Sequence, residues 1–549
     1  MAHMSHPPPE LLQPNGLHTS SVLGSRWFRV CSRGCWWRPI LLALLVLMVG
    51  SCVTSQGDLI PQEPAFNWQP YGPTLPALAR ASSRNVRDLS SRIFALIRAA
   101  QAAQQADQSN LAFSSLNRAL FLTQRVPNPL LRAELYSALG LQFQNLERTT
   151  EALEVVTRGV DIIIEQIQRS PNPEARTIQV LEDLIYTLFT LGPAGFNQLR
   201  RAIQRVYIIP DLGQRVLLLT QIVTEYQRQG AGQRASLLLQ QSIAALDAIE
   251  NPFLKIRAYG AVARRFAAQD DLADAQRFAN LTLDLLNQIS ISSVQGQDEA
   301  HLAQAVLYLI EMDLTTPIPG FIFQFPSAQQ RQNLLTGLAI QFFRTGQPFA
   351  AELILQQLIQ QLNQTPNSAN FLYGTLGLVE IYLDADDPLS AEFFFDRLAR
   401  DVFSGQVLFA TDDFALSEML ILSIRLELLD WSRQILAEIT DPYLALLALD
   451  RALPLATQGD NQELVAWILN NESALLGQLE QQQDDGRSRL ALGYARAGLM
   501  AQSLDMIQTI ENPYILSLTA SEMSLVQPPE AWEPYRGRIQ GLLELFAPQ

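Results

Sequence analysis

Residues 249–254 read IENPFL, and residues 510–515, near the other end of the chain, read IENPYI. Asparagine favours the position just before a helix, because its side-chain oxygen accepts hydrogen bonds from the unpaired N–H groups of the first turn. Proline suits the next position, since it has no N–H to leave unpaired. The hexapeptide therefore predicts a helix start, and its recurrence predicts a joint between repeats rather than two halves of one site.

The joint keeps a fixed distance to an alanine further along the chain. Asn251 lies 24 residues before Ala275, and the same offset recurs for Asn128 and Ala152, Asp211 and Ala235, Ser327 and Ala351, and Asn367 and Ala391. Pro129, Pro442 and Pro513 occupy the place of Pro252. With Ala112 and Ala194 added, the alanines recur about every 40 residues, apart from a double interval around residue 313, which is typical of a helical repeat array.

The segments between the joints have helical periodicity. Residues 214–230, QRVLLLTQIVTEYQRQG, carry apolar side chains at 218, 219, 222, 223 and 226, which is the stripe of an amphipathic helix. Residues 350–364, AAELILQQLIQQLNQ, repeat the pattern. The sequence predicts an all-α protein, an α-α superhelix or solenoid of about ten to twelve antiparallel helix pairs with a period of about 40 residues.

Each repeat also carries an aromatic residue nine positions before its alanine, often with Gly or Asp between them. The triplets are Tyr226–Gly230–Ala235, Phe266–Asp270–Ala275 and Phe342–Gly346–Ala351, and Phe143 and Tyr382 keep the nine-residue spacing. The aromatic fills the gap between two helices, the alanine permits their close approach, and Gly or Asp suits the turn. This pattern resembles the tetratricopeptide repeat, three of whose signature positions match Gly140, Phe143 and Ala152. A HEAT-like or another α-solenoid is the alternative.

The array is expected over residues 80–549, with an irregular insert at about 313–327, and three segments precede it. A basic and polar lead spans residues 1–38, an apolar segment spans 39–53, and a Pro-rich linker spans 54–79. Arginines before a short apolar run and small residues after it have the order of an export signal. Residues 49–52, VGSC, resemble the bacterial lipobox, which implies lipidation of Cys52. An uncleaved anchor and ordinary cleavage nearby are the alternatives. We expect a membrane-anchored protein of the bacterial envelope, with its body on the periplasmic side.

Composition excludes several classes of function. The formal net charge is −15, and so acidic a body would be repelled by phosphate backbones, which argues against nucleic-acid binding. The cysteines are Cys31, Cys35 and Cys52, and His301 is the single histidine after the apolar segment. A zinc site or a Cys–His nucleophile pair cannot be assembled in the body from these residues. We expect no metal, no cofactor and no catalysis.

Two features bear on the alternative of an α/α-fold enzyme that uses carboxylates. Residues 384–387, DADD, match the acid motif of terpene cyclases, but their place just after Tyr382 predicts a turn and a helix cap. His301 lacks partners for general-base chemistry and is expected on a helix surface or in the groove.

The stretch TTPIPGFIFQFPS at residues 315–327 interrupts the helical pattern. Its aromatics alternate as Phe321, Phe323 and Phe325 and are bounded by prolines. We expect them to fill the core of the solenoid. The alternative is a loop that docks a partner or touches a membrane.

The resemblance to tetratricopeptide repeats implies a groove lined by the first helix of each pair. The family's groove-facing positions fall on Thr220, Gln227, Arg228, Arg264, Asn333, Arg344, Tyr373 and Glu380. Arg228, Arg264 and Arg344 are suited to bind a carboxylate or phosphate through paired N–H donors. We therefore expect a scaffold that is tethered at the envelope and binds a partner protein or peptide. A structural envelope component that self-associates through its ends is the remaining alternative.

Overall fold

The computed structural model describes residues 66–169, 175–209, 211–312, 318–363, 369–405, 412–459 and 461–546. The chain divides into two units, residues 1–59 and 60–549, and every described residue lies in the second unit. The described ranges contain α-helices and short 3-10 turns and no β-strand. The all-α class and the repeat architecture are therefore confirmed.

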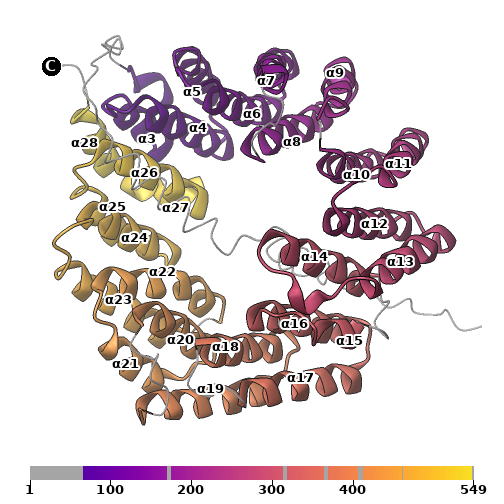
Figure 1. The fold of residues 1–549 in the computed structure, drawn as a ribbon. Coiled ribbons are helices and arrows are strands. Elements are labelled where there is room, and N and C mark those ends of the chain that lie inside the picture. Colours follow the sequence, from indigo (N-terminus) through magenta and orange to yellow (C-terminus); the bar gives the residue numbers. More distant parts are fainter. Residues whose placement is uncertain are drawn as a thin grey trace, which may run out of the picture. The chain divides into compact units, whose positions relative to one another are not determined.

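Most helices come in consecutive pairs, each with a first and a second helix (Figure 1). The first helices are α4 (Leu89–Gln105), α6 (Pro129–Asn145), α8 (Ala175–Thr190), α10 (Leu212–Arg228), α12 (Pro252–Ala267), α14 (Gln297–Glu311), α16 (Ala328–Arg344), α18 (Ala369–Asp384), α20 (Asp413–Arg425), α22 (Pro442–Gln458), α24 (Gln483–Arg496) and α26 (Pro513–Val526). The second helices are α5 (Ser109–Thr123), α7 (Thr149–Arg169), α9 (Phe196–Val206), α11 (Gly232–Leu246), α13 (Leu272–Asn287), α17 (Pro348–Asn363), α19 (Pro388–Phe403), α21 (Leu429–Glu438), α23 (Gln462–Leu476) and α25 (Met500–Ile507).

The remaining elements are short and lie at the ends or in the irregular part of the array. They are η1 (Gln69–Tyr71), α3 (Leu75–Ser83), η2 (Gly192–Gly195), η3 (Ile291–Ser293), α15 (Ile318–Ile322), α27 (Pro529–Trp532), η4 (Glu533–Tyr535) and α28 (Arg536–Glu544). Each first helix packs against the first helix of the next pair, so that the first helices form an inner row and the second helices an outer row (Figure 1).

The predicted joints have the expected geometry. The side chains of Asn128, Asp211, Asn251 and Ser327 each accept a hydrogen bond from an N–H of the first turn of the helix that follows. Pro129, Pro252, Pro442 and Pro513 are the first residues of α6, α12, α22 and α26. Asn367 lies outside the described residues. The hexapeptide is thus confirmed as a joint between repeats.

The aromatic, turn and alanine positions are confirmed as well. The aromatics Phe143, Tyr226, Phe266, Phe342 and Tyr382 are buried, and so are the alanines Ala112, Ala152, Ala235, Ala275, Ala351 and Ala391. Gly230, Asp270 and Gly346 have positive φ, which is the backbone conformation expected of these turns. Ala194 is the exception, because it is exposed in η2 before α9 begins at Phe196. The prediction for Ala194 was wrong: a glycine-rich 3-10 turn replaces the helix start there.

The last first helix, α26, has no second helix of its own after it in the chain. The N-terminal helix α3 packs on α26 instead, as well as on α4 (Figure 1). The Ser517 hydroxyl donates to the carbonyl oxygen of Ala79 (2.7 Å), Arg98 pairs with Glu522, and the Gln105 amide donates to the carbonyl oxygen of Leu525 (3.3 Å). The two ends of the array therefore complete one helix pair between them, and the circuit of packed first helices is closed.

The structure also moves the start of the array. We expected a linker up to residue 79, but α3 begins at Leu75. The hydroxyl of Thr74 accepts a hydrogen bond from the N–H of Ala77, and Pro76 lies in the first turn. Local capping thus starts a helix where composition indicated a tether, because proline is as compatible with a first helical turn as with a linker.

Within the aromatic stretch, Ile318–Ile322 form the one-turn helix α15, and Phe323 and Phe325 follow this helix in a turn. Phe321 and Phe325 are buried, and Phe323 is 43% exposed. The expectation that these rings fill the core is therefore confirmed for two of the three.

Candidate functional site

The predicted groove residues all lie on first helices, namely α10, α12, α16 and α18. Thr220 is nevertheless buried, and its hydroxyl donates to the carbonyl oxygen of Leu217 (2.7 Å), so it faces the core rather than a partner. Asn333 is exposed and accepts a hydrogen bond from the amide of Gln329 (3.0 Å). All eight predicted residues therefore lie on first helices, but Thr220 does not face outward.

Two of the three predicted arginines, Arg264 and Arg344, act on the carboxylate of Glu311 together with a further one, Arg265, and the third, Arg228, acts on Arg265. Nε of Arg264 donates to Glu311, and the Arg264 guanidinium lies 5.4 Å from the centre of the Tyr308 ring. Arg265 and Arg344 also act electrostatically on Glu311, and Arg228 acts on Arg265. We call the four arginines Arg228, Arg264, Arg265 and Arg344 the arginine cluster.

The helices explain why these side chains converge. Arg228, Arg264, Arg265 and Arg344 lie in the last turns of α10, α12 and α16, and Glu311 is the last residue of α14. These four first helices are consecutive neighbours in the inner row. Cations at helix C-termini are stabilised by the partial negative charge of the helix dipole. Repetition of this favourable position on adjacent helices builds the arginine cluster.

Arg265 distinguishes the arginine cluster from a set of ordinary solvated arginines. Burial, followed by the repulsion of Arg264 and Arg228, lowers the pKa of Arg265 to about 10. Its guanidinium makes no hydrogen bond or ion pair with any residue that the structure describes. A partly buried charge without an acceptor is unfavourable. An anion that reached Arg265 would therefore relieve an existing cost.

The carboxylates beside the arginine cluster pair with arginines other than Arg265. Glu311 is paired with Arg264, and burial raises the pKa of Glu311 despite its arginine neighbours. Arg228 is paired with Glu225 within α10. Among the described residues, Glu311 and Glu225 thus pair with Arg264 and Arg228, and Arg265 has no carboxylate of its own. Buried Oε1 of Glu311 and Nε2 of Gln227 also have no hydrogen-bond partner among the described residues.

Tyr373 and Glu380 lie in a second polar cluster further along the inner row. Burial, followed by repulsion from Glu418 and Asp384, raises the pKa of Glu380 to about 7. Glu418 pairs with Arg451 of α22 (2.5 Å), and Asp384 pairs with Arg425 of α20 (2.8 Å).

The hydroxyl of Tyr373 lies 3.5 Å from Oδ2 of Asp412, at the edge of hydrogen-bond range. Burial and Asp412 raise the pKa of Tyr373 to about 12. This part of the inner row therefore contains carboxylates that are already matched by arginines.

Sequence reasoning missed Arg265, Glu311 and Tyr308. The adjacent arginines at 264–265 were a visible signal for Arg265, since two consecutive positions at a helix end can both reach a neighbouring helix. Glu311 and Tyr308 carried no signal, because α14 lies in the double interval of the repeat, where no alanine fixes the register.

The DADD stretch makes a turn and a cap, as expected. Asp386 has positive φ, and Asp387 caps α19 through the N–H of Ser390 (3.1 Å). Nδ1 of His301 lies 3.3 Å from Nη1 of Arg257. Burial and Arg257 lower the pKa of His301. Neither feature assembles a catalytic group.

The predicted export segment and Cys52 lie outside the described residues. No helix of the described part combines the length and the apolar character that membrane crossing requires. Nor do three His, Cys, Asp or Glu side chains meet there as a group that could hold a metal ion.

Comparisons with known proteins place the chain in no family. No protein-family model matches the sequence, and no curated protein does. Among solved structures, Ton1535 from Thermococcus onnurineus NA1 is similar at 13% identity and a TM-score of 0.24, over 69% of this chain and 100% of that one. The human IFIT1 dimer with PPP-AAAA is similar at 12% identity and a TM-score of 0.21, over 79% and 93%. A circular tandem repeat protein is similar at 13% identity and a TM-score of 0.14, over 86% and 93%. These scores carry no functional argument, and the function has to be argued from this chain's own residues.

Proposed function

We propose that the helical array is a non-catalytic scaffold that binds a partner protein through an acidic segment at the arginine cluster. The observation that carries the proposal is the guanidinium of Arg265, which is partly buried, is repelled by Arg264 and Arg228, and has no acceptor among the described residues. Guanidinium groups bind carboxylates through paired N–H donors, and water exclusion strengthens such contacts. A run of Asp and Glu in a partner fits this site.

The partner class follows from charge and from the form of the binding surface. A chain with a net charge of −15 repels a nucleic-acid backbone as a whole, whereas a short acidic peptide can reach one local positive cluster. The arginine cluster is spread over α10, α12 and α16, three of four consecutive first helices, which suits an extended segment better than a single small anion.

We further propose that the scaffold is exported and tethered at the bacterial envelope by its N-terminal segment, with Cys52 as the lipidated residue. The support is the order of arginines, apolar run and small residues before Cys52. Mass spectrometry of the N-terminal peptide from purified membranes tests this part. An unmodified chain that continues on the N-terminal side of Cys52 would contradict lipidation.

Fluorescence anisotropy with a labelled decapeptide of alternating Asp and Glu tests the binding proposal. The double variant Arg265→Gln and Arg344→Gln should weaken binding at least tenfold, because it removes two of the four positive charges. The matched control is Arg158→Gln with Arg433→Gln, two exposed arginines of the outer helices α7 and α21 that form i,i+4 and i,i+3 ion pairs. Equal affinity of both double variants would refute the arginine cluster as the binding site.

Affinity capture from membrane extracts then identifies the partner. The full-length protein and the Arg265→Gln, Arg344→Gln variant serve as paired baits. Proteins captured by the first and lost with the second are the candidates, and they should carry acidic segments.

A further inference from the structure

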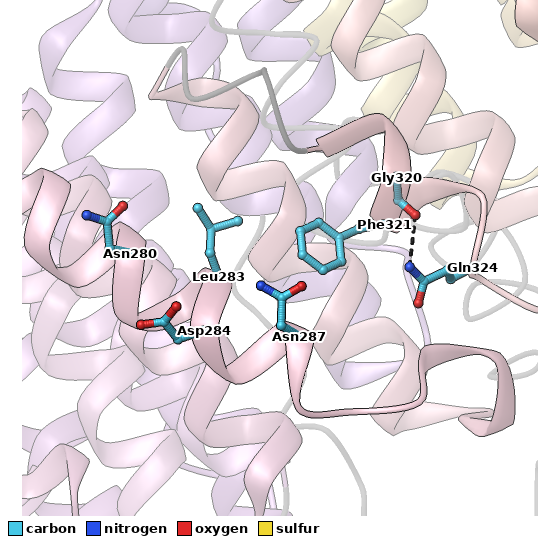
Figure 2. A pocket seen from close by; sticks show the side chains of 7 residues that line it. All are labelled: Asn280, Leu283, Asp284, Asn287, Gly320, Phe321 and Gln324. Atoms are coloured by element: carbon cyan, nitrogen blue, oxygen red, sulfur yellow. Dashed lines mark hydrogen bonds between the residues drawn. The ribbon is translucent and has the colours of Figure 1, made fainter.

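A second surface with binding character lies on the outer helix α13, away from the arginine cluster. Two adjoining cavities of about 560 and 500 Å3 run along this helix and share Asn280 and Asp284. Figure 2 shows the larger one, into which Asn287 of α13 and Phe321 and Gln324 of the α15 segment also point. We call this surface the amide groove; it is lined by Gln276, Asn280, Asp284 and Asn287 on one side and Gly320, Phe321 and Gln324 on the other.

Carboxamides dominate the polar lining, and their hydrogen bonds are only partly used. Nε2 of Gln276 donates to Oδ1 of Asn280 (2.9 Å), and Nε2 of Gln324 donates to the carbonyl oxygen of Gly320 (3.0 Å). Nδ2 of Asn280 and the whole side-chain amide of Asn287 have no partner among the described residues. The groove therefore offers donors and acceptors side by side.

The spacing of these groups fits an extended chain. Gln276, Asn280 and Asp284 are four residues apart, so they recur about every 6 Å along the helix axis. In an extended strand, side chains and peptide groups of one orientation recur every two residues, or about 6.7 Å. Carboxamides match the peptide group in chemistry, since each has an N–H donor and a C=O acceptor.

We propose that the amide groove binds an extended peptide strand of another protein, with one aliphatic and one basic side chain. Leu283 and Phe321 supply an apolar corner for the aliphatic residue. The exposed carboxylate of Asp284, which makes no ion pair with the described residues, faces the basic residue. This site is independent of the arginine cluster, and its strand differs in charge from the acidic segment proposed there.

Asp284 and the carboxamides argue against an anionic ligand. The arginine that borders the smaller cavity, Arg277, lies 3.5 Å from Asp274 and over the ring of Phe278, so its charge is engaged. A neutral oligosaccharide would also use carboxamides, but it would not need the carboxylate of Asp284 to face a cation. A basic peptide and a neutral oligosaccharide therefore differ in whether their binding depends on the charge of Asp284.

An array of capped decapeptides tests the proposal, with one leucine and one arginine moved through a Ser- and Thr-rich sequence. The strongest binder is measured by anisotropy with the full-length protein in detergent. Asn287→Ala and Gly320→Leu should each weaken binding about tenfold, the first by removing a hydrogen-bonding amide and the second by filling the cavity. A Cβ added at Gly320 meets no atom within 4 Å, so the first atom of the new side chain has open space.

Two variants serve as matched controls. Gln356→Ala changes the exposed residue of α17 that stands five positions after the repeat alanine, as Asn280 does in α13. Gly541→Leu adds the same side chain to an open position of α28. Both should leave the affinity unchanged, and Asp284→Asn should remove the preference for arginine in the peptide.

A separate experiment tests whether the groove recognises the backbone of the peptide. Methylation of alternate backbone nitrogens in the chosen peptide keeps its side chains but removes N–H donors, and it should abolish binding. Three results would overturn the proposal: no peptide of the array binds below 1 mM, the methylated peptide binds equally well, or an N-acetylglucosamine oligomer binds instead and is lost in Asn287→Ala.

Discussion

Three of the joints between repeats combine two side-chain contacts. The cap residue accepts hydrogen bonds from N–H groups of the new helix, and an arginine four positions later donates to a carbonyl oxygen two positions before the cap. This second contact joins Arg132 to Val126 (3.3 Å), Arg215 to Ile209 (3.0 Å) and Arg331 to Phe325. Each of these three joints thus satisfies backbone N–H donors as well as a backbone carbonyl acceptor where two units meet. At the Asn251 joint, Lys255 donates instead to the carbonyl oxygen of Asp247 (3.0 Å).

Replacing Asn251 by alanine should destabilise the protein by about 1 kcal/mol, because the N–H groups of Phe253 and Leu254 lose their acceptor. Thermal unfolding measures the effect. Asn333→Ala, at an exposed mid-helix position, is the control and should change stability by less than about 0.5 kcal/mol. An equally small effect at both sites would show that water caps the helix as well as Asn251 does.

Glu380 makes stability depend on pH. Because its pKa in the folded protein is raised from 4.5 to about 7, the folded state binds a proton more tightly than the unfolded state. The corresponding stability is present below about pH 4.5 and is lost as the pH rises through about 7. At pH 8, Glu380→Gln should therefore be more stable than the unchanged protein by about 3 kcal/mol and should unfold at a higher temperature, whereas at pH 4.5 the two should differ little. A difference of the same size at both pH values would exclude this titration.

Whether a feature of a single residue could be predicted from sequence depends on how far apart in the chain the contacting residues lie. The caps at Asn128, Asp211, Asn251 and Ser327 could be predicted from sequence because their hydrogen bonds span two or three residues. The environment of Arg265 could not, because it is set by Arg228 and Glu311, which lie on two other helices. Its lack of an acceptor becomes visible only in three dimensions.

Within a helix pair, close approach depends on small residues at the contact. In α6, a Cβ added at Gly140 would lie 2.2 Å from Cγ2 of Val156 in α7. Valine has few side-chain conformations in a helix, so it cannot move aside easily. The glycine that matches the tetratricopeptide signature thus has a steric reason in this chain.

Gly140→Ala should destabilise the protein by about 1–3 kcal/mol through overpacking between α6 and α7. The free energy of unfolding in urea measures it. Gly541→Ala in α28, where an added Cβ meets nothing within 4 Å, is the control and should be neutral or slightly stabilising. Equal stability of the two variants would mean that the helices separate at little cost.

At the scale of elements, the periodic units could be predicted and the irregular ones could not. The alanine rule placed α7, α11, α13, α17 and α19, because each buries its alanine against a first helix. It failed at Ala194, where the chain makes η2 before α9. The alanine rule also gave no register for α14 and α15, so it could not predict the cavity between α13 and α15.

The closure of the array is the feature of the whole molecule that sequence did not indicate. Its contacts join residues 438 positions apart, as for Ala79 and Ser517. The repeat period of the sequence does not indicate such a long-range pairing, and the Pro-rich composition before residue 80 suggested a tether. Because α3 packs on both α26 and α4, a helix of the same chain covers the place where the two ends of the array meet.

A closed array has thermodynamic consequences that an open one lacks. In an open array each repeat is stabilised by its neighbours alone, and the terminal repeats fray. Here α26, the last of the first helices, packs against a helix from the N-terminal end of the array. Loss of packing at one end of the array should therefore also destabilise the helix at the other end.

Leu78→Ala tests this dependence directly. Leu78 is fully buried in α3, and truncating such a side chain costs about 2–5 kcal/mol. Hydrogen exchange, followed peptide by peptide, should become faster in residues 75–83 and equally in residues 513–526, while the first helices α10 and α12 keep their protection. Leu545→Ala, at a side chain that is 75% exposed next to α28, is the control and should leave both segments unchanged. If exchange rose in residues 75–83 alone, α26 would be stable without its N-terminal partner, and the array would be closed by contact without being stabilised by it.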